Sequence, residues 1–129
     1  MINDTISDML TCIRNGILIK SQTVTVLSTK INKNIAKILE REGFIESYQT
    51  LNNGKLILKL KYINEDKRSC ITNLRRLSKP GLRIYVNYKE IPRILGGMGI
   101  VILSTSKGII TDNEARYHKI GGELVCSIW

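Results

Sequence analysis

The segment from Gly99 to Lys119, GIVILSTSKGIITDNEARYHK, constrains the fold more than any other part of this sequence. It opens with Ile100 to Leu103, a short run of branched apolar residues that predicts a buried β-strand. Thr111 followed three residues later by Glu114 is the pattern of a helix capping box, and Asp112 adds negative charge to the first turn. We therefore expect a strand, then a helix, with a short polar segment held between them.

That polar segment contains three hydroxyl side chains, one cation and no large apolar residue. Its residues are Ser104, Thr105, Ser106, Lys107 and Gly108. Hydroxyls and backbone N–H groups held by a strand end and a helix start can be aimed at an acceptor-rich surface, such as a phosphate–sugar backbone or unpaired base edges. The glycine spacing does not match a nucleotide-binding P-loop. The alternative is an ordinary loop that binds nothing.

Net charge is the most informative property of the whole chain. The 129 residues include 20 Lys and Arg against 11 Asp and Glu, a net charge of +9, and this favours a polyanion as partner, with nucleic acid ahead of a membrane surface. The alternative is a generally basic protein without such a partner. Apolar residues make up 43% of a chain long enough for one core or two small subdomains, so wholesale disorder is not expected.

Several classes of function are not expected. All apolar runs are short, so no membrane span is predicted, and the amino end resembles neither a signal nor a transit peptide. Cys12, Cys70 and Cys126 are far apart, which argues against a disulfide framework or a zinc site and favours small buried groups in a reducing compartment. His118 is the only histidine and is interpreted as a helix-end residue. We expect no catalytic residue, cofactor, metal or small-molecule substrate.

The first part of the chain is predicted to be a helix–strand–helix–hairpin unit. The expected elements are a helix from Asp4 to Lys20, a strand from Thr23 to Leu27, a helix capped by Ser28 or Thr29 that runs through Glu42 to Gly43, a strand from Phe44 to Thr50, a turn at 52–54 and a strand from Leu56 to Tyr62.

One face of the second predicted helix carries a row of cations. They lie opposite the apolar stripe Ile31, Ile35, Ile38 and Leu39, and are Lys30, Lys33, Lys37 and Arg41. Such a row could follow a polyanion backbone, or it could be an ordinary solvated helix face.

The polar segment 64–70 is the predicted boundary between an N-terminal α/β subdomain, 1–63, and a C-terminal subdomain, 71–129. The elements expected after it are a strand from Ile71 to Leu77 that contains Arg75 and Arg76, a type II turn at 78–81 with Gly81 at positive φ, a strand from Leu82 to Val86, one helical turn at 90–95, a Gly121–Gly122 turn and a strand from Glu123 to Trp129. The fold class is α+β, with a mostly antiparallel sheet and short helices in the C-terminal subdomain.

These residues closely resemble a known family. SKPGLRIYV, IPRILGGMGIVILSTSKGIITDNEAR and GGELVCSIW resemble the C-terminal half of the small-subunit ribosomal protein eight family, and DTISDMLTCIRN and INKNIAKILEREGFIE resemble its N-terminal half. Only residues 49–70 show no family pattern. Thr5, which stands where many bacterial members have proline, and Arg93 to Gly97 are more similar to plastid members, so we expect a plastid ribosome, with the bacterial cytoplasm as the alternative.

The resemblance implies two α/β subdomains and a primary binder of the central domain of small-subunit ribosomal RNA. It further implies that the C-terminal subdomain makes the main contact with an irregular RNA helix, and that neighbouring ribosomal proteins are partners. The implied contact residues are Ser104, Thr105, Ser106, Lys107 and Gly108, and, near them, Ser78, Lys79, Pro80, Gly81, Tyr85, Gly122 and Glu123.

Our hypothesis divides the work between two sets of residues. The hydroxyls of residues 104–106 select the RNA site, whereas a set of cations holds the RNA backbone. This second set is Lys30, Lys33, Lys37, Arg41, Arg75, Arg76 and Lys79. The alternative functions are a repressor that binds its own messenger RNA, a non-specific nucleic-acid-binding protein, and an enzyme that holds an anionic substrate at residues 106–108.

Overall fold

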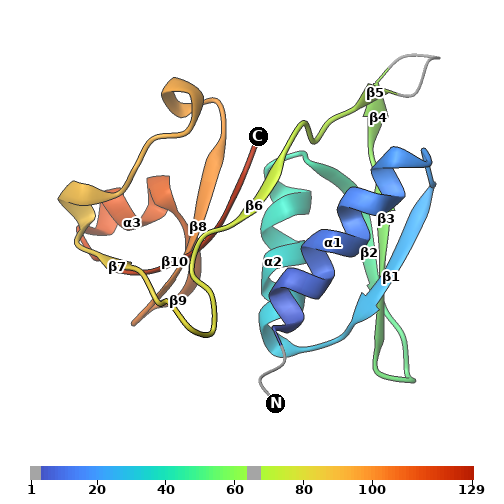
Figure 1. Cartoon of the computed structure of the whole chain (residues 1–129), viewed down its shortest axis with the longest axis horizontal. Helices are drawn as coiled ribbons and strands as arrows, with labels where there is room; N and C mark the ends of the chain where they lie inside the picture. Colours follow the sequence, from blue (N-terminus) through green and yellow to red (C-terminus); the bar gives the residue numbers. More distant parts are fainter. Residues whose placement is uncertain (1–3, 64–67) are drawn as a thin grey trace. The chain divides into compact units, whose positions relative to one another are not determined.

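The computed structural model describes residues 4–63 and 68–129, and their contacts form two compact units. The N-terminal unit is Thr5–Thr72, and the C-terminal unit is Asn73–Trp129 together with Asp4. Each unit combines helix with antiparallel sheet, which confirms the α+β class (Figure 1). Of the predicted linker, residues 64–67 lie outside the described residues.

The N-terminal unit is a three-stranded antiparallel sheet with two helices on one face (Figure 1). Its elements are α1 (Thr5–Leu18), β1 (Thr23–Leu27), α2 (Lys30–Arg41), β2 (Ile45–Thr50) and β3 (Lys55–Leu60), with strand order β1-β3-β2. Leu56, Leu58 and Leu60 alternate along β3 and are buried. A strand period of two puts all three on the same face, where they form the floor of the core.

The predicted ends of the second helix are confirmed. Thr29 is the N-cap of α2, and its hydroxyl accepts a hydrogen bond from the backbone N–H of Asn32 at 3.0 Å. Gly43 follows the helix at φ 81°, a conformation that glycine adopts without strain. Ile31, predicted to lie in the apolar stripe, is exposed instead.

The predicted strand from Leu56 to Tyr62 is interrupted. β3 ends at Leu60, and β4 (Tyr62–Ile63) pairs separately with β5 (Arg68–Ser69), which falls within the predicted linker.

The C-terminal unit is a five-stranded antiparallel sheet with a short helix packed on β8 and β9. Its elements are β6 (Leu74–Arg76), β7 (Tyr85–Val86), two 3-10 turns η1 (Tyr88–Glu90) and η2 (Leu95–Gly97), β8 (Ile100–Thr105), β9 (Gly108–Thr111), α3 (Asp112–His118) and β10 (Gly122–Ile128). The strand order is β6-β10-β8-β9, and β7 also pairs with β10. The core of this unit is formed by Ile91, Val101, Leu103, Ala115 and Leu124.

The predicted path of strand, loop and helix through Gly99–Lys119 is partly wrong. Residues Gly108–Thr111 form β9, which pairs antiparallel with β8, and only then does α3 begin. Gly108 has φ 100°, which lets the chain reverse after two residues at a position where other residues would be strained. The polar segment therefore lies at a β-hairpin turn. The capping box of Thr111 and Glu114 is confirmed.

Other predicted elements of this unit are shorter than expected or displaced. Residues 90–95 do not form one helical turn, since η1 and η2 flank an extended stretch. Lys79 and Leu82 exchange backbone hydrogen bonds of 2.9 Å, but Gly81 is not among the residues with positive φ, so the turn is not type II. Gly122 belongs to β10 and not to a turn.

Asp112 ties three parts of the C-terminal unit together. Its buried carboxylate accepts from the backbone N–H of Val101 on β8 at 3.3 Å and from Nη1 of Arg116 at 2.8 Å. Arg116 also donates from Nη2 to the carbonyl of Pro92 at 2.9 Å. Because the buried charge is both paired and hydrogen-bonded, it holds α3 and the 91–92 loop against β8.

The three cysteines are free, and only Cys126 is buried as predicted, whereas Cys12 is exposed. Burial raises the pKa of the Cys126 thiol to about 12, so this thiol stays protonated and behaves as a small apolar group. Among residues 4–63 and 68–129, no helix is long and apolar enough to cross a membrane, and no cluster of His, Cys, Asp and Glu could hold a metal ion.

Gly16 provides a test of the packing of α1 on β1. A Cβ atom at this position would lie 2.3 Å from Cγ1 of Val24, so the helix meets the strand where there is no room for a side chain. We expect Gly16→Ala to lower the free energy of unfolding in urea by about 1–3 kcal/mol despite alanine's better helix propensity, because overpacking outweighs it.

Two variants serve as controls for this prediction. Asn15→Ala, at an exposed position on the same helix, should be nearly neutral. Adding Val24→Ala to Gly16→Ala should recover part of the loss because it removes the clashing methyl. Equal stability of Gly16→Ala and the wild type would contradict the close contact.

Candidate nucleic-acid interface

The tip of the β8–β9 hairpin carries two exposed polar residues of the segment Gly99–Lys119. Thr105 pairs with Gly108 across the hairpin, so Ser106 and Lys107 form a two-residue loop, and both are exposed. Among the hydrogen bonds of the described residues, none uses the Ser106 hydroxyl. Ser106 therefore presents a donor and an acceptor to a ligand.

Thr105 has a different role from Ser106. Its hydroxyl donates to the carbonyl of Gly108 at 3.0 Å and accepts from the backbone N–H of Lys107 at 3.1 Å. Both bonds close the turn from within. The Thr105 hydroxyl thus stiffens the loop that presents Ser106 and Lys107, and only one lone pair is left for a ligand.

Three of the predicted contact residues form one row across the sheet. Glu123 on β10 pairs with Tyr85 on β7 on one side and with Ser104 on β8 on the other. Ser104 in turn pairs with Ile109 on β9. Directly paired residues point to the same face with Cβ atoms about 4.5–5.5 Å apart, so these side chains are neighbours. Tyr85 is 69% exposed, which leaves its ring free to stack.

Two consecutive glycines make this row possible. A Cβ on Gly121 would lie 2.2 Å from the carbonyl oxygen of Val86, and a Cβ on Gly122 would lie 2.2 Å from the carbonyl oxygen of Ser104. The start of β10 is therefore inserted between β7 and β8 at a distance that excludes any side chain. Gly122 sets the spacing of the strands, and Glu123 is the first residue of β10 to carry a side chain.

Arg83 joins this row through Glu123. Nη1 of Arg83 lies 3.0 Å from one carboxylate oxygen of Glu123 and 3.3 Å from the other. The hydrogen bond and the attraction of the carboxylate raise the pKa of Arg83 above its ordinary value. The sequence analysis did not select Arg83 as a contact residue. The sequence signal that could have identified Arg83 is its position two residues before Tyr85 in a predicted strand, because this spacing puts both side chains on one face.

Ser78 does not fit the predicted role. It is fully buried, and its hydroxyl accepts from the backbone N–H of Ile84 at 2.9 Å and faces the carbonyl of the same residue at 3.4 Å. Those bonds fix the loop that carries Lys79, Pro80 and Gly81, of which Lys79 and Gly81 are exposed. Ser78 is thus a support for the loop and not a surface residue.

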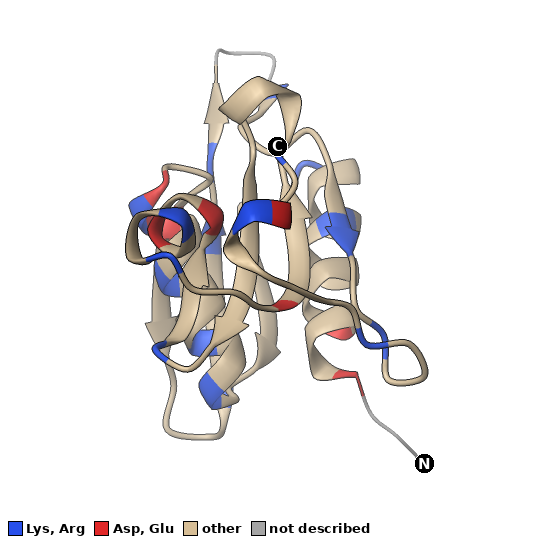
Figure 2. Ribbon diagram, turned by 90° about the vertical axis from the view of Figure 1, so that its left-hand side faces the viewer, with Lys and Arg blue, Asp and Glu red and all other residues tan. Residues whose placement is uncertain are grey.

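The predicted backbone-holding cations are distributed over both units, with Asp and Glu among them (Figure 2). Lys30, Lys33 and Lys37 are exposed on α2, and Arg41 lies 3.7 Å from Glu42. These cations belong to the N-terminal unit, whereas the hairpin tip and the Tyr85–Glu123–Ser104 row belong to the C-terminal unit.

The two arginines of β6 differ. Arg75 is exposed, but Nε of Arg76 lies 3.2 Å from Asp4, and its Nη1 donates to the carbonyl of Val125 at 2.5 Å. The side chain of Arg76 is only 12% exposed. The guanidinium of Arg76 therefore bonds within the protein. The prediction that Arg76 holds the RNA backbone does not fit this position, and we interpret Arg76 as a structural residue.

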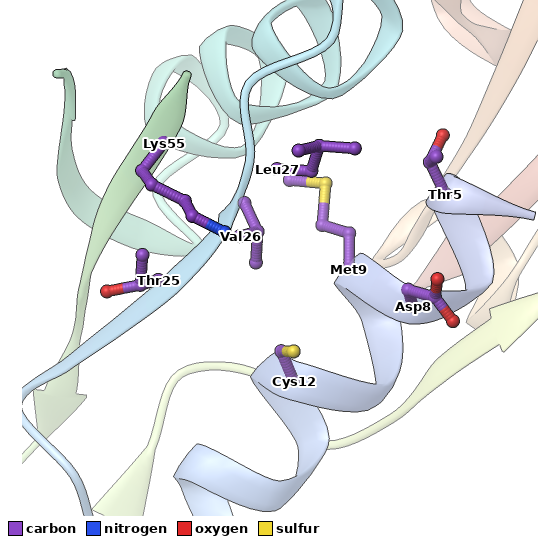
Figure 3. A pocket seen from close by; sticks show the side chains of 8 residues that line it. All are labelled: Thr5, Asp8, Met9, Cys12, Thr25, Val26, Leu27 and Lys55. Carbon is purple, nitrogen blue, oxygen red and sulfur yellow. The ribbon is translucent and has the colours of Figure 1, made fainter. Parts of the chain in front are cut away.

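The pocket of the N-terminal unit that is shown in Figure 3 does not suggest a second site. The pocket in Figure 3 lies between α1 and β1, has a volume of about 130 Å³ and is lined by Met9, Cys12, Val26 and their neighbours. A volume this small is below the range of pockets that enclose a nucleotide-sized molecule. Its one acid, Asp8, and its one base, Lys55, are on different elements and form no ion pair in the described structure.

Comparison with known proteins agrees with the resemblance of the sequence. The family model of ribosomal protein S8 matches residues 4–129. Among curated proteins, the chain is 63% identical to "small ribosomal subunit protein uS8c" of Tupiella akineta over 131 aligned residues and 56% identical to that of Oltmannsiellopsis viridis over 129, in both cases over 100% of each chain. It is 62% identical to the same protein of Marchantia polymorpha over 98% of each chain.

A match over nearly the whole chain at these identities confirms the family that the motifs of both halves of the chain indicated. The chain belongs to the ribosomal protein S8 family, a family of small-ribosomal-subunit proteins.

Proposed function

We propose that this protein binds the central domain of small-subunit ribosomal RNA and stabilises an irregular RNA helix there during assembly and translation. As a member of the S8 family it is a constituent of the small subunit, and its uS8c relatives make that ribosome the plastid one. Its relatives are structural proteins, so it acts by binding and not by catalysis.

The observation that carries this proposal is the exposed, unpaired hydroxyl of Ser106 on a turn that Thr105 closes from within. The deep groove of an A-form helix is closed to side chains, so proteins recognise RNA at irregular places where bases, 2′-hydroxyls and phosphates are accessible. A small hydroxyl on a rigid turn can enter such a place and both donate and accept. Tyr85 offers an aromatic face for a base or ribose beside it.

The exposed cations supply the sequence-independent part of the affinity. We assign this role to Lys107 in the turn, to Lys79 in the loop before β7, to Arg75, and to the α2 row Lys30, Lys33, Lys37 and Arg41. Arg76 and Ser78 are not assigned contacts, because both are committed to internal hydrogen bonds.

We expect Ser106→Ala to weaken binding to an isolated fragment of the rRNA central domain by about 1–3 kcal/mol, because a hydrogen bond in a dehydrated contact is lost. The slope of log K against log salt should hardly change, since no charge is removed. Filter binding or calorimetry over a series of salt concentrations measures both quantities.

The control for this variant is Ser47→Ala, at a half-buried position of the N-terminal unit, which should leave the affinity unchanged. Wild-type affinity of Ser106→Ala for the cognate fragment would remove direct reading by this hydroxyl.

Thr105 should affect binding through the shape of the turn. Thr105→Val removes both hydrogen bonds that close the turn, at about 0.5–1.5 kcal/mol each, whereas Thr105→Ser keeps the hydroxyl. We expect the Val variant to speed hydrogen exchange of the Lys107 amide and to weaken cognate binding, and the Ser variant to stay near the wild type. If the amide is equally protected in both variants, the hydroxyl does not hold the turn.

Lys37 provides a test of the backbone-holding row. Lys37→Ala should weaken cognate and unrelated RNAs alike and lower the salt slope by about one, because one phosphate contact is lost. A loss confined to the cognate fragment would show that this lysine reads a specific feature. Duplex DNA as competitor tests the non-specific alternative, which requires comparable affinity for DNA and RNA.

A further inference from the structure

The Arg83–Glu123 ion pair poses a question that the proposed contacts leave open. Glu123 stands between Tyr85 and Ser104, in the middle of the row of proposed contact residues. Its side chain is only 14% exposed, while that of Arg83 is 52% exposed. A carboxylate here has lost much of its water, and Arg83 is the cation that lies against it.

A carboxylate is an unusual group to place where an RNA strand must approach. A negative charge near phosphates is repelled, and the repulsion grows where water is excluded. A carboxylate is also an acceptor only, so it can form hydrogen bonds with N–H or O–H donors but not with phosphate oxygens. Its presence is favourable only if the charge is compensated and the ligand offers a donor.

We propose that Arg83 is a positioning residue of the RNA site, which acts through Glu123 by fixing its carboxylate beside Ser104 and balancing its charge, so that Glu123 accepts a hydrogen bond from the donor edge of an unpaired nucleobase. The proposal rests on the function proposed above. The ligand group it requires is a hydrogen-bond donor, which the exocyclic amino or ring imino group of a nucleobase supplies. In the RNA backbone only the ribose 2′-hydroxyl is a donor, and phosphate and sugar-ring oxygens cannot take this place.

The geometry supports action through Glu123. A single nitrogen of Arg83, Nη1, bridges both carboxylate oxygens, which fixes the rotation of the carboxylate. The backbone supports the same alignment, because the N–H of Leu124 donates to the carbonyl of Ile84 at 2.9 Å and so holds the residues after Arg83 and Glu123 together. The competing role is a direct contact of the guanidinium with phosphate, in which Glu123 would be incidental.

A double-mutant cycle on the full-length protein separates the two roles. The variants are Arg83→Gln, Glu123→Gln and the double variant, and the probe is the rRNA central-domain fragment. We expect each single variant to weaken binding about tenfold, because one leaves a carboxylate uncompensated and the other removes the ionised acceptor. In the Glu123→Gln background, Arg83→Gln should lower the affinity for the fragment by less than about twofold.

Lys79→Gln is the matched control. Lys79 is an exposed cation of the neighbouring turn, and no carboxylate of the described residues forms an ion pair with it. If Lys79 contacts phosphate, Lys79→Gln should lower the affinity for the fragment by the same factor in the wild-type and the Glu123→Gln backgrounds. If Arg83→Gln shows this same background-independent cost, Arg83 contacts phosphate and the proposal is overturned.

A measurement on the free protein tests the positioning itself. In ¹⁵N spectra, rotation of the Arg83 guanidinium should be slow in the wild type and fast in Glu123→Gln, and a lysine at position 83, in Arg83→Lys, should restore only part of the affinity because it lacks the planar group. Equally fast rotation in wild type and variant would contradict the proposal. Amide spectra of each variant confirm that it is folded.

The outcomes also separate this inference from the proposed function. If Ser106→Ala weakens binding but the Arg83 and Glu123 effects add, only the positioning role fails. If the wild type shows no preference for the cognate fragment over unrelated RNA, the proposed function fails, whatever the cycle gives.

Discussion

The arrangement of the C-terminal unit depends on the backbone contact at Gly121 and Gly122. The carbonyl oxygens of Val86 and Ser104 occupy the space on either side where side chains would lie. Only glycine allows β10 to run this close to β7 and β8, and this approach brings Tyr85, Glu123 and Ser104 into one row. A larger residue at either position would separate the strands that set the spacing of the proposed site, so we expect the two glycines to support binding without touching the ligand.

The site also shows a division between hydroxyls that build and hydroxyls that remain available. Ser78 and Thr105 use theirs to fix the loop before β7 and the turn after β8. Ser106 is exposed on the turn that Thr105 closes. Ordering a flexible loop on binding costs conformational entropy. A turn that internal hydrogen bonds already close loses less entropy on binding, so more of the free energy of its contacts appears as affinity. We therefore expect the internal hydrogen bonds of Thr105 to raise the affinity of the proposed contact at Ser106.

The sequence predicted the elements whose signal is local. The strand Thr23–Leu27 and the capped helices α2 and α3 were predicted correctly, because the alternation of apolar and polar residues and the capping residues can be recognised from neighbouring positions in the sequence. β9 was missed because its four residues are too few for a period and its pairing with β8 depends on the reversal at Gly108. The burial of Ser78 and the internal hydrogen bonds of Arg76 were also missed, because each depends on a partner that only the tertiary fold provides: Ile84 for Ser78, and Asp4 and Val125 for Arg76.

The net positive charge of the protein and the carboxylate of Glu123 in the proposed site have complementary electrostatic roles. A surplus of cations attracts any polyanion, and attraction of that kind does not distinguish one RNA from another. Discrimination between RNAs is improved by a group whose contribution to the binding free energy is favourable with one ligand group and unfavourable with another. In the proposed site Glu123 is such a group, because its carboxylate would repel a phosphate and accept a hydrogen bond from a base, and compensation by Arg83 would keep the repulsion from cancelling the overall attraction. A neutral hydroxyl such as that of Ser106 accepts either kind of partner, so hydroxyl and carboxylate together exclude more wrong ligands than either does alone.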